Sequence, residues 1–195
     1  PRVMAGPRDA DLKQLADLLA KSERPLLLVG GALLADAVAD ESVFADLKKL
    51  SEEWVLPICP THRRPQLFDM THPHYGGYMG IRVPPAQLEE MKRSDLMVVL
   101  GERLTDSVSQ SYSFPSAPQP QLPLVHVWPD GNEVGRVWRP DLGIPASPGE
   151  TIRSLLRGGP PDDAEKRQFW VEGLNGIHRG LMAKEWEPTS DGVNG

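Results

Sequence analysis

Two kinds of apolar spacing alternate along the chain. Uninterrupted apolar runs at 26–29 and 96–100 lack polar residues at alternate positions, which predicts strands buried on both faces. Between such runs, apolar residues recur every three or four positions, as in amphipathic helices. Further strands are expected at 55–59, 124–128 and 142–146, with a very short one within 74–80. Helices are expected at 9–21 (with Asp9 as N-cap), 36–54, 84–93, 149–157 and 166–184.

Strands and helices therefore alternate, which predicts an α/β fold with right-handed crossovers. We expect a three-layer α/β/α Rossmann-like domain around about six parallel strands. Ligands of such sheets bind outside the carboxyl ends of the strands. Glycine there lets a backbone approach a phosphate closely, and the next helix N-terminus favours the anion. The residues at these ends are Gly30, Gly31, Gly80, Gly101 and Asp130.

Three features at or near these strand ends have two interpretations each. Gly30-Gly31 is followed by Ala-Leu-Leu, so it is not the G-x-G-x-x-G fingerprint, and tight-turn packing competes with ligand contact. Arg103 could pair with a phosphate through its planar fork, or form a salt bridge to Glu102, Asp106 or a neighbouring chain. Asp130 could accept a hydrogen bond from a ribose hydroxyl, or form the turn Pro-Asp-Gly-Asn.

Other polar residues offer less chemistry. His72 and His74 lie two apart without a third metal ligand, and His126 falls inside a strand, as a core residue would. Cys59 has no base beside it in the sequence, so we do not expect a nucleophile. The serines of 107–113 lack the G-x-S-x-G elbow.

Composition narrows the class of partner. The net charge of -6 argues against nucleic acid, because no basic surface is available to displace counterions. No apolar run approaches the ~20 residues of a membrane span. A single cysteine excludes an intrachain disulfide and a zinc site built on several thiolates, which fits the cytoplasm. Both ends read as cuts or linkers, so we expect a piece of a longer protein, with 1–8 as a linker.

The order of several motifs resembles a known family. LAKSERPLLLVGG, HPHYGGYMG, SDLMVVLGERLTD, LVHVWPD and IPASPGETIRSL follow one another at consistent spacing. This series is similar to the central domain of thiamine-diphosphate enzymes of the acetolactate synthase and 2-keto-acid decarboxylase family. The resemblance covers about residues 9–157. It implies the strand order 3-2-1-4-5-6.

The resemblance also implies what lies outside this chain. In that family an N-terminal domain supplies a glutamate that activates the cofactor, and a C-terminal domain carries G-D-G, which holds Mg²⁺ and the diphosphate. G-D-G does not occur in this sequence. Residues 9–157 would thus be the central domain. Residues 158–195 would be a helical extension and linker toward a missing C-terminal catalytic domain. The thiamine diphosphate and Mg²⁺ sites would lie elsewhere.

Central domains of this family bind FAD in acetolactate synthases and ADP in some relatives. The positions that match are Gly30, Gly31, Gly80, Arg82, Gly101, Arg103 and Asp130. Departures are substantial: Arg82 stands where flavin-binding members often have His. Ala32 replaces a third glycine, and Trp128 and Ser147 replace acids. FAD or ADP is a candidate ligand, but these departures predict that FAD binds weakly or not at all.

The resemblance implies a domain that joins two catalytic domains of one enzyme and contributes to homo-oligomer contacts. The isolated chain would be catalytically silent. The alternative is a nucleotide-binding module for FAD, ADP or coenzyme A, motivated by the glycines and Arg103 at the strand ends. A sirtuin-like NAD-dependent deacylase shares the sheet type, but the usual four-cysteine zinc site cannot be built from one cysteine.

Overall fold

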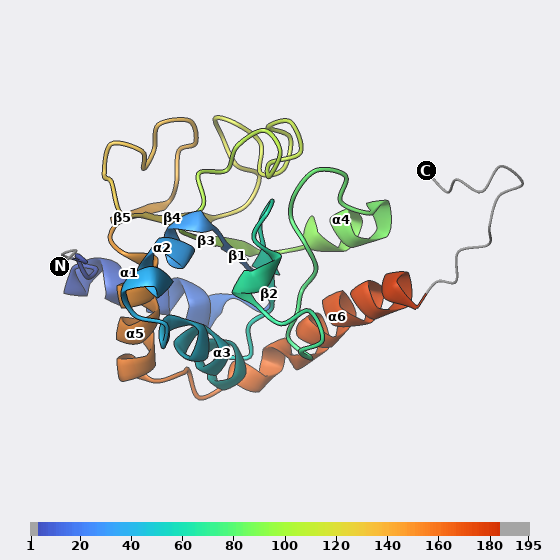
Figure 1. Ribbon diagram of the computed structural model, residues 1–195, viewed down its shortest axis with the longest axis horizontal. Coiled ribbons are helices and arrows are strands. Elements are labelled where there is room, and N and C mark those ends of the chain that lie inside the picture. Colours follow the sequence, from blue (N-terminus) through green and yellow to red (C-terminus); the bar gives the residue numbers. More distant parts are fainter. Residues whose placement is uncertain (1–3, 184–195) are drawn as a thin grey trace, which may run out of the picture.

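A computed structural model describes residues 4–183 (Figure 1). Its sheet has five parallel strands in the order β2-β1-β3-β4-β5. The strands are β1 (Pro25–Val29), β2 (Ile58–Pro60), β3 (Leu96–Leu100), β4 (Leu124–Trp128) and β5 (Leu142–Pro145). The α/β fold class is therefore confirmed. Among the helices of residues 4–183, none combines the length and the apolar composition of a membrane-spanning segment.

The third expected strand is reduced to two isolated bridges outside β2. Tyr75 pairs with Ile58 and Met79 with Thr61, both in parallel. Gly77 between them has φ +101°, a left-handed conformation that breaks extended pairing. The segment still lies beside β2, where the order 3-2-1-4-5-6 puts it. The strand count is thus lower than expected and the order agrees.

The helices follow the predicted pattern with one break. They are α1 (Asp9–Lys21), α2 (Gly31–Ala39), α3 (Val43–Glu53), α4 (Pro85–Met91), α5 (Pro148–Gly158) and α6 (Gln168–Met182), with short 3-10 helices at Pro65–Leu67 and Ala164–Arg167. The helix expected over 36–54 is two helices. Asp40 ends the first, and its carboxylate accepts a hydrogen bond from Ser42 N at 3.1 Å, which turns the chain. The N-cap of α1 is Arg8, not Asp9.

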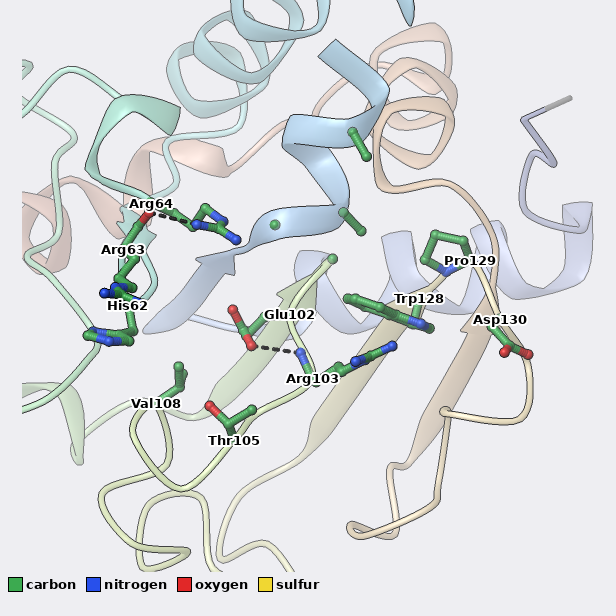
Figure 2. Close-up of a pocket in the computed structure, with 14 residues that line it drawn as sticks. His62, Arg63, Arg64, Glu102, Arg103, Thr105, Val108, Trp128, Pro129 and Asp130 are labelled. Carbon is green, nitrogen blue, oxygen red and sulfur yellow. Dashed lines mark hydrogen bonds between the residues drawn. The ribbon is translucent and has the colours of Figure 1, made fainter. Parts of the chain in front are cut away.

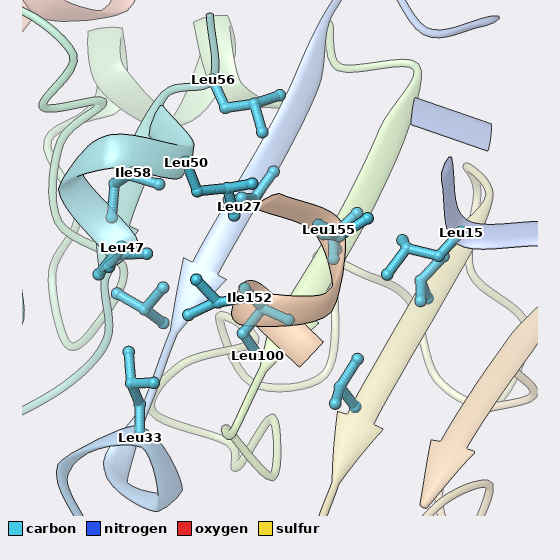
Figure 3. Close-up of a cluster of buried hydrophobic side chains, with 14 of the residues drawn as sticks. Leu15, Leu27, Leu33, Leu47, Leu50, Leu56, Ile58, Leu100, Ile152 and Leu155 are labelled. Atoms are coloured by element: carbon cyan, nitrogen blue, oxygen red, sulfur yellow. The ribbon is translucent and has the colours of Figure 1, made fainter. Parts of the chain in front are cut away.

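Both faces of the sheet are apolar because alternate strand residues enter two cores. Leu27 and Val29 face one core with α1, α3 and α5, and Figure 3 shows Ile152 and Leu155 of α5 over this face. Leu26 and Leu28 face the other core. The helical residues that complete this second core are Met91 of α4 and Trp170 and Leu174 of α6. The result is the three-layer arrangement expected for uninterrupted apolar strands.

Helix α6 packs against the same body. The indole of Trp170 donates to Pro25 O at 2.7 Å, and Asn175 Nδ2 donates to His72 O and Tyr75 O, each at 3.1 Å. These bonds join α6 to β1 and to the segment outside β2. The helix expected over 166–184 is thus present at 168–182, while the expected tail beyond residue 183 and the first three residues lie outside the described part. The proposed boundaries at 8/9 and 157/158 stay predictions.

Candidate functional site

A cavity of about 630 Å³ opens at the carboxyl ends of the strands (Figure 2). Its walls come from the start of α2 and from the loops that follow β2, β3 and β4. Four residues expected at the site line it: Gly31, Gly101, Arg103 and Asp130. The parallel topology brings these segments to one edge, as the sequence indicated.

Gly30 serves the packing of two loops. Its amide donates to Leu100 O at 3.0 Å, and Ala32 N donates to Gly101 O at 3.0 Å. A Cβ on Gly30 would stand 2.5 Å from Gly101 O, which no side chain tolerates. Gly101 itself has φ +73°. The close approach of the loops after β1 and β3 is therefore sufficient reason for glycine at position 30. Of the two adjacent glycines, Gly31 lines the cavity and Gly30 does not.

Arg103 lies over the indole of Trp128. Its guanidinium carbon is 5.0 Å from the ring centroid, within cation–π range. Its Nε is 3.5 Å from Glu133 Oε2, so its ion-pair partner is neither Glu102 nor Asp106. The side chain is 57% exposed, so this pair is a weak restraint.

Glu102 and Asp130 already use their carboxylates within the protein. Glu102 accepts from the Thr61 hydroxyl at 2.6 Å and from Arg103 N at 2.8 Å. Asp130 Oδ1 accepts from the backbone N of Asn132 at 3.0 Å and from its Nδ2 at 2.9 Å. Asp130 thus has the geometry of a turn former.

Besides Gly30, two further expected site residues lie outside the cavity lining. Gly80 is covered by the ring of Tyr78, and its carbonyl accepts from Gln110 Nε2 at 2.9 Å. Arg82 is exposed and has φ +58°. The structure therefore does not bring these two residues together with Gly31, Gly101 and Arg103.

The loop after β2 supplies residues that the sequence reading missed: His62, Arg63 and Arg64 all line the cavity. Arg64 lies against the first residue of α2, with its Nε 3.0 Å from the position of a Cβ on Gly31. Its Nη1 donates to Arg63 O at 2.8 Å. The available signal was two consecutive arginines in the loop after a strand, at the same edge as the glycines.

The remaining polar candidates have internal partners. His126 is 4% exposed, and its Nε2 is hydrogen-bonded to Glu102 O at 2.9 Å, as a core residue. Burial lowers the pKa of His126 and raises the pKa of the Cys59 thiol, which disfavours the thiolate. His72 meets Glu52 at 3.1 Å, and His74 Nδ1 lies 2.9 Å from Ser51 O. Within residues 4–183, no three His, Cys, Asp or Glu side chains come together as metal ligands.

Comparison with known proteins gives a consistent result. The sequence model of the family described as "Thiamine pyrophosphate enzyme, central domain" matches residues 12–155. A probable acetolactate synthase large subunit of Methanocaldococcus jannaschii is 26% identical over 161 residues, covering 83% of this chain and 26% of that protein. The acetolactate synthase of Mycobacterium bovis is 27% identical over 191 residues, covering 95% of this chain and 29% of that protein.

A relative with a different printed activity is also similar. The sulfoacetaldehyde acetyltransferase of Rhodobacter capsulatus is 28% identical over 163 residues, covering 80% of this chain and 26% of that protein. The chain therefore spans about a quarter to three-tenths of the length of these relatives.

Proposed function

Since the chain belongs to the thiamine pyrophosphate enzyme central-domain family, we propose that it is the connecting domain of a longer thiamine-diphosphate enzyme. The match over residues 12–155 carries this proposal. In this longer enzyme, the domain would join an N-terminal and a C-terminal catalytic domain of the same protein and contribute to contacts in a homo-oligomer. We place the whole enzyme in the cytoplasm.

The cofactor would supply the hard chemistry of the reaction when bound to those other domains. No set of three ligating carboxylate, imidazole or thiolate groups comes together within residues 4–183. This chain's contribution would be to hold its neighbours in place, through a core that covers both faces of the sheet.

For the whole enzyme we propose formation or cleavage of a carbon–carbon bond next to the carbonyl of a 2-keto acid. The printed names of two relatives, both acetolactate synthases, support this class. The sulfoacetaldehyde acetyltransferase is a relative of similar identity, so the substrate is not narrowed further.

Turnover of pyruvate and benzoylformate tests this function. The chain alone, supplied with thiamine diphosphate and Mg²⁺, is expected to give no product above the protein-free reaction. The longer protein that contains it is expected to turn over a 2-keto acid only when the cofactor is present. Turnover by the isolated chain would overturn the proposal.

A second candidate function is a nucleotide-binding module for FAD, ADP or coenzyme A. The cavity at the strand ends, lined by Gly31, Gly101 and Arg103, favours it. ADP at 100 times its dissociation constant would stabilise the fold by ~2.7 kcal/mol, and Arg103→Ala should abolish that gain. The absence of any thermal shift with millimolar ADP, FAD or coenzyme A would leave the connecting role alone. For FAD we expect little or no binding, because Trp128 and the Asp130 turn occupy the end of β4.

A further inference from the structure

A hollow of about 350 Å³ lies between α1 and the end of α5, and it shares no residue with the cavity at the strand ends. We call it the α1–α5 hollow. Its walls include the apolar side chains of Leu12 and Ala16 on α1 and of Leu155 on α5. Trp54, the residue that follows α3, also lines it and is only 2% exposed. A concave and mostly apolar surface of this size suits a small ligand.

Two glycines leave this hollow open. Gly158 is the last residue of α5, and Gly159 has φ +77°, a left-handed conformation that ends the helix. Both line the hollow, and a Cβ built on either one would meet no other part of the described chain within 4 Å. The space beside the end of α5 is therefore free for a group from outside.

The hollow also borders an unsatisfied hydrogen-bond donor. Within residues 4–183, Trp54 Nε1 is buried and has no acceptor. A buried indole usually has one. Trp138 Nε1 donates to Pro115 O at 3.2 Å, and Trp170 Nε1 donates to Pro25 O at 2.7 Å. Because a buried N–H that has lost water and gained no partner destabilises the fold, an acceptor supplied from the hollow would be favourable.

The polar groups around the hollow have partners or face solvent. Lys13 Nζ donates to Asp17 Oδ2 at 2.8 Å, and Ser154 Oγ accepts from Arg157 Nη2 at 2.7 Å. Asp9 is exposed in the first turn of α1, a helix end that suits its charge. A charged ligand would lose its hydration against the apolar walls, whereas an uncharged ligand would not suffer this cost.

We propose that the α1–α5 hollow binds a small uncharged compound with an apolar ring and one carbonyl oxygen, and that this oxygen accepts a hydrogen bond from Trp54 Nε1. The ring would lie against Leu12, Ala16 and Leu155. The site lies outside the cavity of the second candidate function and requires no neighbouring domain. The inference is therefore independent of both proposed functions.

Titration of acetophenone and of toluene into the isotope-labelled 195-residue chain, followed by NMR, tests this site. Both probes carry an apolar ring, but only acetophenone carries an acceptor. The indole N–H signal of Trp54, identified by its loss in Trp54→Phe, should shift saturably with acetophenone. We expect a dissociation constant of about 1 mM for a compound of this size.

Trp54→Phe tests the hydrogen bond, because it removes the donor and keeps an aromatic ring. Read from the backbone signals of the lining residues, it should weaken acetophenone binding about fivefold to tenfold and leave toluene binding within about twofold.

Gly158→Leu tests the location. Its side chain would fill the hollow and should weaken binding of both probes more than about tenfold, and its Cβ has room in the fold. Gly176→Leu on α6, where a Cβ also meets nothing within 4 Å, is the matched control outside the hollow and should bind like the parent chain. The melting temperature of each unliganded variant confirms that it folds.

Three results would overturn the inference. The first is the absence of a saturable shift of the Trp54 signal with acetophenone. The second is acetophenone binding that neither Trp54→Phe nor Gly158→Leu weakens. The third is a Trp54 signal that moves with protein concentration and not with acetophenone, which would assign the hollow to a second copy of the chain. The connecting role is read separately, by the turnover of 2-keto acids.

Discussion

The Ser147 hydroxyl donates a hydrogen bond to Asp36 Oδ2 at 2.7 Å, which fastens α5 to α2 through two fully buried side chains. The same carboxylate oxygen accepts from Gly149 N at 3.0 Å, in the first turn of α5. Ser147 is the N-cap of α5, and its hydroxyl oxygen accepts from Glu150 N. Asp36 therefore satisfies donors at a buried helix N-terminus that have no other carboxylate, and its charge suits that end of the helix.

Asp36→Ala should lower the free energy of unfolding by about 2 to 4 kcal/mol, because it strands a buried hydroxyl and a buried amide. Urea denaturation followed by far-UV circular dichroism measures the change. Asp17→Ala removes an exposed aspartate paired only with Lys13, and it should leave the midpoint unchanged. Equal midpoints for the two variants would show that the Asp36 contacts do not hold α2 to α5.

The two adjacent glycines should respond differently to alanine. A Cβ on Gly30 would meet Gly101 O at 2.5 Å and the Glu102 Cα at 2.7 Å, both fixed parts of the fold. Gly30→Ala is therefore expected to destabilise by about 2 to 3 kcal/mol. On Gly31 the nearest atoms belong to the flexible Arg64 side chain, at 3.0 Å or more.

Gly31→Ala is thus the matched control. Alanine is the better helix former, which offsets the small shift of Arg64, so stability should stay within about 1 kcal/mol of the parent chain. Thermal and urea unfolding measure both variants. A greater loss for Gly31→Ala than for Gly30→Ala would contradict the packing described for the loops after β1 and β3.

Arg167 is a buried cation that donates hydrogen bonds to carbonyls at the C-terminal ends of two helices. Its guanidinium donates to Trp54 O at 2.6 Å, to Ser22 O at 3.1 Å and to Leu19 O, all near the C-terminal ends of α1 and α3. A cation suits the negative end of a helix. Burial lowers the pKa of Arg167, but these carbonyls compensate its charge.

Arg167→Met should cost about 3 to 5 kcal/mol, since three buried carbonyls lose their donor. Arg167→Lys should lose less, because one ammonium keeps part of the bonding without the planar fork. Arg179→Met on the exposed side of α6 is the control. If Arg167→Met and Arg179→Met unfolded at the same urea concentration, the hydrogen bonds of Arg167 would not stabilise the fold.

Three histidines make stability depend on pH. Burial lowers the pKa values of His74, His126 and His178 below the ordinary 6.5. The unfolded chain therefore takes up protons near pH 6.5, while the folded chain does so only at lower pH. Their contribution is complete above pH 6.5 and is lost as pH falls through the folded values.

The urea concentration at the unfolding midpoint should accordingly decrease as the pH is lowered from 7.5 to 5.5. His126→Gln can keep a donor near Glu102 O but cannot titrate, so its midpoint should change less over the same range. A midpoint that rises on acidification, or an identical slope in the variant, would contradict this assignment.

Local pattern alone was enough to predict most of the fold. The run Leu96–Leu100 is a strand with the predicted bounds, and the leucines of 9–21 form the predicted helix. The sequence reading missed the break at Asp40, because an aspartate that bonds to the amide two residues later resembles ordinary helix surface in a pattern. It also predicted a continuous third strand, whereas in the structure Gly77 interrupts the pairing.

The site was harder to predict because it is formed by tertiary contacts between residues that lie far apart in the sequence. Proximity in sequence suggested Glu102 and Asp106 as partners of Arg103, yet its partner is Glu133, on the loop after the next strand. Arg64 was missed because its place against Gly31 depends on two parallel strands meeting at one edge. Gly80 and Arg82 were expected at the site but line no part of the cavity, since the segment after β2 carries them past it.

The most direct test of the connecting role is a titration of thiamine diphosphate into this chain with and without Mg²⁺. A catalytic cofactor site binds the diphosphate through the metal ion, and the connecting role places that site on the other domains of the enzyme. We therefore predict that Mg²⁺ never strengthens binding. Saturable binding of thiamine diphosphate that requires Mg²⁺ would contradict the account of this chain as a domain without a cofactor site of its own.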